Sequence, residues 1–348
     1  MNVTDARQDG HMPSRKLISR VFRHEESLRA AILIVVIMVF AGLTKGKTLQ
    51  FSSIMNTLLS SGTTGIATIG QLFVVLGGGI DVSIGSSIGG VAILAGVFNA
   101  ALMGSAMGAL PIFTQILLPV GLATLITLLL GVGIGLGNGM LISRIDTPPL
   151  ITTLAMAPIV LGVAKYITGG HRMGELPANL AFWGQGRILE VPVPFIIFVV
   201  VAVITYFVLN HTTYGKAVYA SGGNPAATYL CGINIKNVIL STYAISGFLA
   251  ALTGTIMVSK VMIADINMAP YLMIDTIAAV AIGGVSLSGG RGTLIGAVIG
   301  VFLISVVSNG MNVLLLGPAG QGLARGLIIL VAVAVDVIRR KGESEAIV

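Results

Sequence analysis

The chain alternates between long apolar segments and short polar connections. Ten apolar segments can be distinguished, roughly at residues 28–44, 53–76, 84–103, 113–136, 149–168, 192–210, 238–259, 271–285, 293–310 and 321–338. A helix needs about 20 apolar residues to cross about 30 Å of hydrocarbon. Several of these segments are shorter or rich in glycine, so we expect some of them to be short or broken. The pattern predicts an all-α, polytopic membrane protein with about ten transmembrane helices.

Composition supports a location in lipid. The chain is 55% hydrophobic and 9% charged, whereas a soluble domain carries about 25% charged residues. Its 46 glycines agree with this, because glycine allows membrane helices to approach closely. In the run GVGIGLGNG (131–139), glycines four residues apart favour such helix packing over nucleotide binding.

The distribution of positive charge predicts the orientation. With the N-terminus inside, the inner tails and connections carry thirteen of the 20 Lys and Arg residues, against seven outside. This agrees with the positive-inside rule and places both termini in the cytoplasm. We therefore expect a basic cytoplasmic tail at 1–27, a transmembrane domain at 28–338 and a second cytoplasmic tail at 339–348. The net charge of +7 does not indicate nucleic-acid binding, because no basic stripe is interleaved with aromatic residues.

Two interpretations of the N-terminal tail remain open. The first is a short amphipathic helix on the anionic inner leaflet, which would make membrane lipids a partner. Its apolar face would carry Leu17, Ile18, Val21 and Phe22, with Arg15, Lys16, Arg20 and Arg23 around the rest. The second is a disordered basic tail that only determines the orientation.

The polar connection at 211–237 carries signals for a short helix of its own. Asn224 is a favourable N-cap and Pro225 suits the first helical position. Gly232 is placed to end the helix in the left-handed conformation. Two capped helical turns between membrane spans indicate that a soluble partner docks on them from the cytoplasm.

Two junctions rich in glycine and serine resemble each other, GGGIDVSIGSSIGG (77–90) and GGVSLSGGRGTLIGA (283–297). Both lie at inner ends of predicted spans, and they are consistent with an ancient duplication. The candidate site residues of these junction loops are Asp81, Ser83, Ser288 and Arg291, and Asp81 could contact the partner. Asp81 has a second interpretation, which we favour, as the cap of the following helix.

Polar residues share one face of the second apolar segment. Asn56, Ser60, Thr63, Thr64, Ala67 and Gln71 recur at spacings of three and four. Such groups either bond to neighbouring helices or line a water-filled path. A path of hydroxyls and amides would suit an uncharged polyhydroxy solute, with Asn56, Ser60, Thr64 and Gln71 as lining residues. Asp275, the clearest ionisable residue inside a span, is a further candidate.

Lys165 and Arg325 are expected near outer span ends, where their charges would reach water. No series of carboxylates and histidines suggests a proton relay. The single cysteine and the four histidines have no metal-ligand spacing. Residues 41–48 resemble a phosphate-binding loop but follow an apolar span instead of a β-strand. We therefore expect no catalytic residues, no metal site and no cofactor.

Three segments carry a family resemblance: LGGGIDVSIGS (76–86), YGKAVYASGGNPAATYLCGINI (214–235) and IAAVAIGGVSLSGGRGTLIGAVIG (277–300). In sequence, order and separation they resemble the signature regions of ribose/xylose-type sugar permeases of ABC transporters, within the branched-chain amino acid/sugar permease superfamily. Thr228 stands where small or charged residues are common, which is a mild departure.

The resemblance implies the transmembrane subunit of an importer in a bacterial inner membrane. Its partners would be cytoplasmic ATPase subunits, a periplasmic sugar-binding protein and a second permease copy, either identical or paralogous. The segment Gly223–Gly232 would be the coupling helix in a groove of the ATPase, and its contact residues would include Ala227, Tyr229 and Leu230. The permease itself would hydrolyse no ATP. A permease for a branched-chain amino acid or nucleoside is the alternative, and a self-sufficient secondary transporter or channel is a more distant one.

Overall fold

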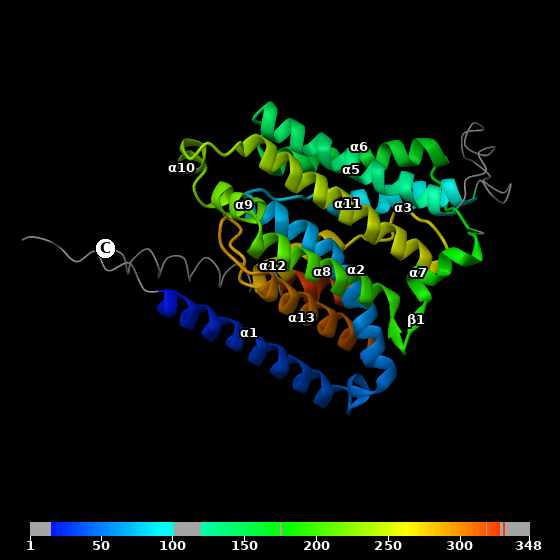
Figure 1. The fold of residues 1–348 in the computed structure, drawn as a ribbon. Helices are drawn as coiled ribbons and strands as arrows, with labels where there is room; N and C mark the ends of the chain where they lie inside the picture. Colours follow the sequence, from blue (N-terminus) through cyan, green and yellow to red (C-terminus); the bar gives the residue numbers. More distant parts are fainter. Residues whose placement is uncertain (1–14, 101–119, 175, 318, 328–329, 331–348) are drawn as a thin grey trace, which may run out of the picture.

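The computed structural model describes residues 15–100, 120–174, 176–317, 319–327 and 330. It is a bundle of helices whose long axes run in roughly the same direction (Figure 1). The helices are α1 (Arg15–Leu43), α2 (Phe51–Leu76), α3 (Ile84–Ala100), α5 (Val120–Arg144), α6 (Pro149–Thr168), α7 (Ala181–Gln185), α8 (Val193–His211), α9 (Thr213–Gly223), α10 (Pro225–Leu230), α11 (Ile235–Val261), α12 (Leu272–Ile282) and α13 (Leu294–Val313). Residues 319–327 are also helical.

Seven helices of the described part are long and apolar enough to cross a membrane: α1, α2, α5, α6, α8, α11 and α13. The apolar helices α3 and α12 are shorter, in agreement with the expectation of short spans. The all-α membrane architecture is therefore confirmed, whereas the count of ten is not. Residues 113–119 and the end of the predicted segment 321–338 lie outside the described residues.

Two boundaries differ from the predictions. The fourth span was expected to end at residue 136, but α5 continues to Arg144, because its glycine-rich stretch packs inside the bundle as regular helix. The tail was expected to form either a separate surface helix or disordered chain. Instead, residues 15–27 belong to α1, which runs without a break from Arg15 to Leu43.

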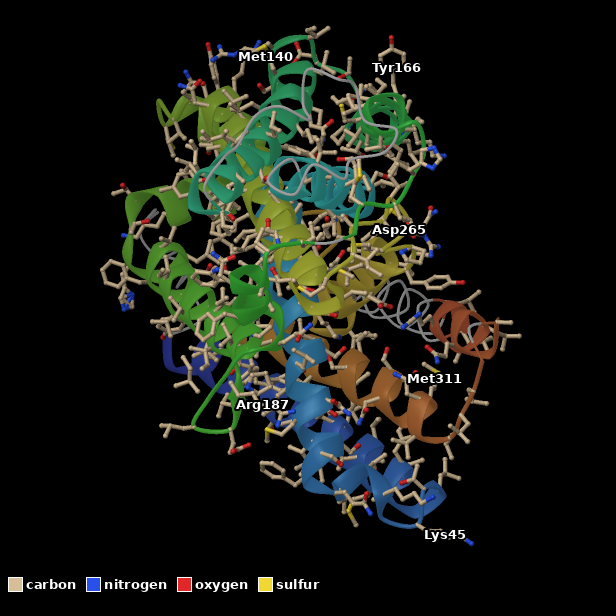
Figure 2. All side chains as sticks on the ribbon, turned by 90° about the vertical axis from the view of Figure 1, so that its right-hand side faces the viewer. Lys45, Met140, Tyr166, Arg187, Asp265 and Met311 are labelled. Carbon is tan, nitrogen blue, oxygen red and sulfur yellow. The ribbon has the colours of Figure 1, made fainter. Side chains whose placement is uncertain are left out.

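The two ends of the bundle are built differently (Figure 1). One end, here called the α10 end, carries α9, α10 and the N-terminal part of α1. The other, the hairpin end, carries short elements that the sequence did not predict: η1 (Lys47–Leu49), η3 (Ala178–Leu180), α7, and the antiparallel strands β1 (Arg187–Ile188) and β2 (Val191–Pro192). Figure 2 looks onto the hairpin end, where Lys45, Arg187 and Asp265 are labelled.

The core surrounds α2 and α11. Ile66, Leu72 and Leu76 of α2 are fully buried, together with Ile256 of α11. The peripheral helices instead leave large apolar side chains on the outside, including Met38, Leu129, Val203 and Phe207. In water this surface would be unfavourable, so the peripheral helices provide the face that contacts lipid.

Helices α5 and α11 pack backbone against backbone. A Cβ atom at Gly135 would overlap the carbonyl oxygen of Tyr243, and one at Gly131 would overlap that of Gly247. Gly247 is equally tight against Gly131. The prediction that the glycines at 131–139 serve close helix packing is therefore confirmed.

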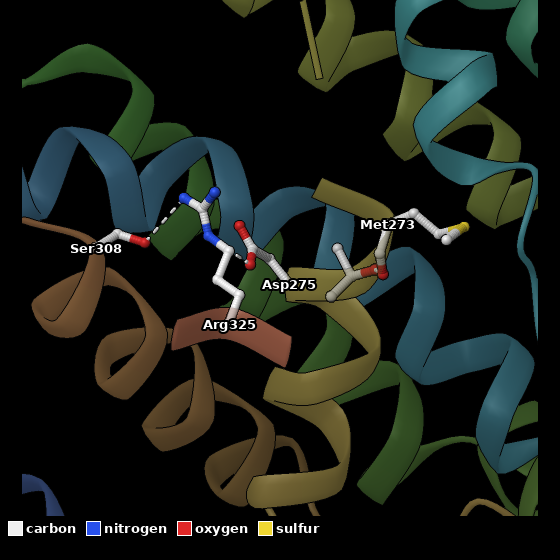
Figure 3. Close-up of polar contacts among 5 residues, drawn as sticks. Met273, Asp275, Ser308 and Arg325 are labelled. Carbon is white, nitrogen blue, oxygen red and sulfur yellow. Dashed lines mark hydrogen bonds and ion pairs between the residues drawn. The ribbon is translucent and has the colours of Figure 1, made fainter. Parts of the chain in front are cut away.

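A buried ion pair joins α12 to the helical residues 319–327. Arg325 Nε lies 3.2 Å from Asp275 Oδ1, and Arg325 Nη2 donates a hydrogen bond to Ser308 Oγ at 3.3 Å (Figure 3). The guanidinium also lies over the Tyr271 ring, 5.0 Å from its centroid. Arg325 was expected to reach water at an outer span end. That expectation is wrong, because its side chain is 15% exposed and its charge is balanced inside the bundle.

We expect Asp275→Asn or Arg325→Met alone to lower the thermal midpoint of the purified protein in lipid nanodiscs. Removing one member of a buried ion pair leaves the other charge uncompensated, at a cost of about 3–5 kcal/mol. The double variant Asp275→Leu/Arg325→Met should recover much of the loss, because no unpaired charge remains. Single variants that melt like the wild type would show that the pair contributes little.

Candidate functional site

The connection at 211–237 forms two capped helices at the α10 end. Thr212 accepts a hydrogen bond from the Gly215 amide and so caps α9, at 3.2 Å. Asn224 Oδ1 accepts from the Ala227 amide and caps α10, at 3.0 Å. Gly232 follows α10 with a φ of +78°. The predicted N-cap at Asn224 and left-handed ending at Gly232 are confirmed.

Helix α10 presents its side chains outward. Tyr229 is 72% and Leu230 85% exposed, and Gly223, Pro225 and Ala227 are exposed as well. Thr228 instead faces the protein, where its hydroxyl donates to the Asn224 carbonyl at 2.8 Å. Exposed tyrosine and leucine on a short capped helix form an apolar surface of the kind that a protein partner covers.

Helix α9 was not predicted from the sequence, in which these residues were treated as part of a polar loop. Its tyrosines join it to two other segments. The Tyr214 hydroxyl shares a hydrogen bond with Ser241 Oγ of α11 at 2.8 Å, and the Tyr219 hydroxyl donates to the Gly292 carbonyl at 3.1 Å. Burial raises the pKa of both tyrosines. Helix α9 is therefore held between α11 and the connection before α13, and α10 is attached to its end.

Glycines from three distant segments meet beside α10. We call them the glycine junction: Gly78 after α2, Gly222 and Gly223 at the end of α9, and Gly289 and Gly290 before α13. The Gly290 amide donates to the Leu76 carbonyl at 3.0 Å. A Cβ atom at Gly222 would overlap that same carbonyl oxygen.

The positive φ angles of Gly78, Gly289 and Gly290 allow this close approach of three backbones. The three segments that carried the family resemblance are thus brought into direct contact. Ser288 and Arg291 flank Gly289 and Gly290 in the connection between α12 and α13 and are exposed, so they lie on the outside of the junction.

Asp81 and Ser83 have a different environment from Ser288 and Arg291. Asp81 is 3% exposed. Its carboxylate accepts from the Ser83 amide at 3.0 Å and the Ser83 hydroxyl at 2.6 Å, and from Ser246 Oγ of α11 at 2.8 Å. Asn138 of α5 donates to Ser83 Oγ at 2.9 Å. This geometry favours the interpretation of Asp81 as a structural cap before α3 over a contact with a partner.

The proposed path residues of α2 fall into two groups. Thr64 and Gln71 are buried. With its amide oriented to satisfy both groups, Gln71 donates to the Asp81 carbonyl at 3.0 Å and accepts from the Asp81 amide at 3.2 Å. Asp275, as described above, is paired with Arg325. In this conformation Gln71 and Asp275 bond to other segments of the bundle and, within its described residues, line no open path.

Asn56 and Ser60 lie nearer the hairpin end and line open space. Two adjoining cavities of about 280 and 260 Å³ share Asn56, Leu59 and Lys260 as lining residues, and Ser60 lines the second. Lys260 was not predicted from the sequence to be part of this region. Lys260 follows the buried Ile256 of α11 by four residues. This spacing does not indicate that the Lys260 side chain shares a cavity with residues of α2.

Comparison with known proteins agrees with the geometry. Residues 53–333 match the family model for the permease component of branched-chain amino acid transport systems. The chain is 33% identical to the ribose import permease protein RbsC of Bacillus subtilis, over 86% of this chain and 89% of that protein. It is 31% identical to the RbsC protein of Haemophilus influenzae, over 88% and 92%. It is 32% identical to the galactose/methyl galactoside import permease protein MglC of Escherichia coli, over 84% and 88%. No solved structure matches the chain.

The family model covers most of the chain. Helix α1 lies before the matched region, and the other six apolar spans of the described part lie in it apart from the first two residues of α2. Its curated relatives are named as transport permeases of bacteria. The chain is a multi-pass bacterial inner-membrane protein, and it belongs to the family of permease components of branched-chain amino acid transport systems.

Proposed function

We propose that this chain is the transmembrane subunit of an ATP-driven importer for a monosaccharide. The relatives named for ribose and galactose import support the solute class. The proposal that a partner ATPase drives transport rests on one observation. Helix α10 is short and capped, leaves Tyr229 and Leu230 exposed, and is joined through α9 to the glycine junction.

In this proposal the α10 end faces the cytoplasm. Helix α10 sits in a groove of an ATPase subunit, and Ser288 and Arg291 of the neighbouring connection flank the contact. Both chain termini are cytoplasmic. The hairpin end receives a periplasmic sugar-binding protein, and a second permease copy completes the path. The permease itself hydrolyses no ATP, and the glycine junction transmits the displacement of α10 to α2 and α13.

A branched-chain amino acid is the alternative solute, because the family description names it. The relatives described above are sugar permeases at 31–33% identity over most of the chain, and this favours the sugar. Uptake into liposomes separates the possibilities. The complete transporter should accumulate radiolabelled ribose or galactose only with internal ATP and external binding protein. Uptake by the chain alone, without ATP, would identify a secondary transporter instead.

We expect Gly232→Val to impair ATPase binding and uptake while the chain still inserts. Gly232 has a φ of +78° and open space around its Cβ position, so the cost is backbone strain, about 1–2 kcal/mol for an L residue and more for a branched one. Gly232→Asn is the matched control, because Asn tolerates this conformation. Co-purification of the ATPase and uptake are the measurements. Normal values for Gly232→Val would remove α10 from the coupling role.

Neighbouring glycines test the junction. Gly222→Ala places a methyl group on the Leu76 carbonyl oxygen, whereas at Gly223 the nearest atom is 3.7 Å away. Gly222→Ala should therefore uncouple ATP hydrolysis from uptake, with the ATPase still bound, while Gly223→Ala behaves as wild type. Hydrolysis and uptake are measured in the same proteoliposomes. Equal behaviour of the two variants would contradict transmission through the junction.

Cysteine labelling tests the path along α2 in a Cys231→Ser background, since Cys231 is exposed. Asn56→Cys and Ser60→Cys should react with a polar thiol reagent in the resting state. Thr64→Cys and Gln71→Cys should react only during ATP turnover, because both native side chains are buried here. Ile66→Cys, in the core of the same helix, should stay unreactive. If ATP changes nothing at 64 and 71, the buried part of this face serves packing alone.

A further inference from the structure

The two cavities at the hairpin end carry polar side chains that lack protein partners. We call them the outer cavities. Within the part of the chain that the structure describes, the side chains of Asn56, Ser60 and Lys260 make no hydrogen bond or ion pair. Asn56 and Lys260 line both cavities, although they come from α2 and α11. Three unpaired polar groups from two helices therefore converge on one space.

Three amide side chains complete the lining, and in each of them only the NH₂ group or only the oxygen is engaged in a hydrogen bond with the described part of the protein. Asn309 Nδ2 donates to Ser53 Oγ at 2.7 Å, which leaves its oxygen available. Asn312 Oδ1 accepts from Gln321 at 2.8 Å, which leaves its NH₂ group. Gln185 Nε2 donates to the Lys260 carbonyl at 3.0 Å, which leaves its oxygen. These bonds hold the three amides in place, and the outer cavities offer both donors and acceptors.

We propose that the outer cavities are a binding site for an uncharged monosaccharide, with Asn56, Ser60 and Lys260 as its principal hydrogen-bonding residues. A sugar hydroxyl donates one hydrogen bond and accepts others, so it needs the mixed set described above. Met55 and Leu59 supply apolar contacts for the C–H face of the ring. The lining contains no carboxylate, and its second cation, Arg187, lies 3.7 Å from Glu190.

The size of the site also fits a small solute. Cavities of about 280 and 260 Å³ lie just below the range of about 300–1,000 Å³ that holds drug-sized ligands. The site rests on the proposed function, since it would receive the sugar at the end where the binding protein releases it. Because its walls belong to α2, α11, α13 and the hairpin segment, movement of α2 relative to α11 would change its shape.

Transport kinetics test the site in the complete transporter reconstituted with its ATPase and binding protein. We expect Lys260→Met, Asn56→Leu and Ser60→Ala each to raise the KM for ribose or galactose about three- to tenfold, the loss typical of one hydrogen bond. Ser52→Ala is the matched control, because Ser52 is exposed on the same helix and lines neither cavity. An unchanged KM in all three variants would overturn the proposal.

Ligand protection gives a second, independent measurement on the full-length chain in nanodiscs. In the Cys231→Ser background, ribose, galactose or fructose should slow the labelling of Ser60→Cys by a polar thiol reagent and leave Ser52→Cys unaffected. Protection by ribose 5-phosphate without protection by any neutral sugar would overturn the proposal in favour of an anion site around Lys260. Equal labelling with and without every sugar would overturn it as well.

Lys260 could instead contact the binding protein. The affinity of the binding protein for the permease complex distinguishes this role from sugar binding. Weaker docking by Lys260→Met, with unchanged sugar protection at Ser60→Cys, would assign Lys260 to that contact. Failure of the proposed function looks different, because the wild-type transporter would then show no ATP-dependent sugar uptake. If the wild-type transporter takes up sugar, the three variants keep its KM and no sugar protects Ser60→Cys, only the proposed sugar site is contradicted.

Discussion

The carboxylate of Asp81 holds together the place where the helical bundle is interrupted. Between α2 and α3 the chain leaves helical geometry at Gly77–Ser83, and Asp81 and Ser83 are buried. Inside a membrane protein, backbone groups outside helices need partners from neighbouring segments. Gln71 binds both backbone groups of Asp81, and Ser246 binds its side chain. This network ties α2 and α11 to the start of α3.

That arrangement explains how a displacement at α10 would reach the centre of the bundle. The end of α9 touches the carbonyl end of α2 at the glycine junction, and the Gly290 amide bonds to the same carbonyl of Leu76. Packed backbones without intervening side chains leave little space to absorb a shift. Helix α2 then continues past the Asp81 network to Asn56 and Ser60 at the opposite end, so one helix connects the proposed coupling surface with the proposed sugar site.

Much of the architecture follows from hydrophobic pattern and local caps. The spans at 149–168, 192–210 and 293–310 agree with α6, α8 and α13 to within three residues at each end, since apolar length determines a span and charges or glycines end it. The cap at Asn224 and the ending at Gly232 were predictable because both depend on neighbours within a few residues. Helix α9 was missed, because its mixed polar and small residues show no apolar face and its stability comes from Tyr214 and Tyr219 bonding to distant segments.

The sequence by itself determined that this chain lies in a membrane, that its helices pack through small residues, and that a capped helix projects at 224–231. Those properties depend on composition and on interactions a few residues apart. Only the tertiary structure decided the partners of each polar residue. It placed Asp275 against Arg325, Gln71 against Asp81, and Asn56 beside Lys260. A polar group in a membrane helix has the same sequence signature whether it bonds a neighbour or faces a cavity. The difference is set by residues that lie far away in the sequence, as Asn309 does from Ser53 at 256 positions.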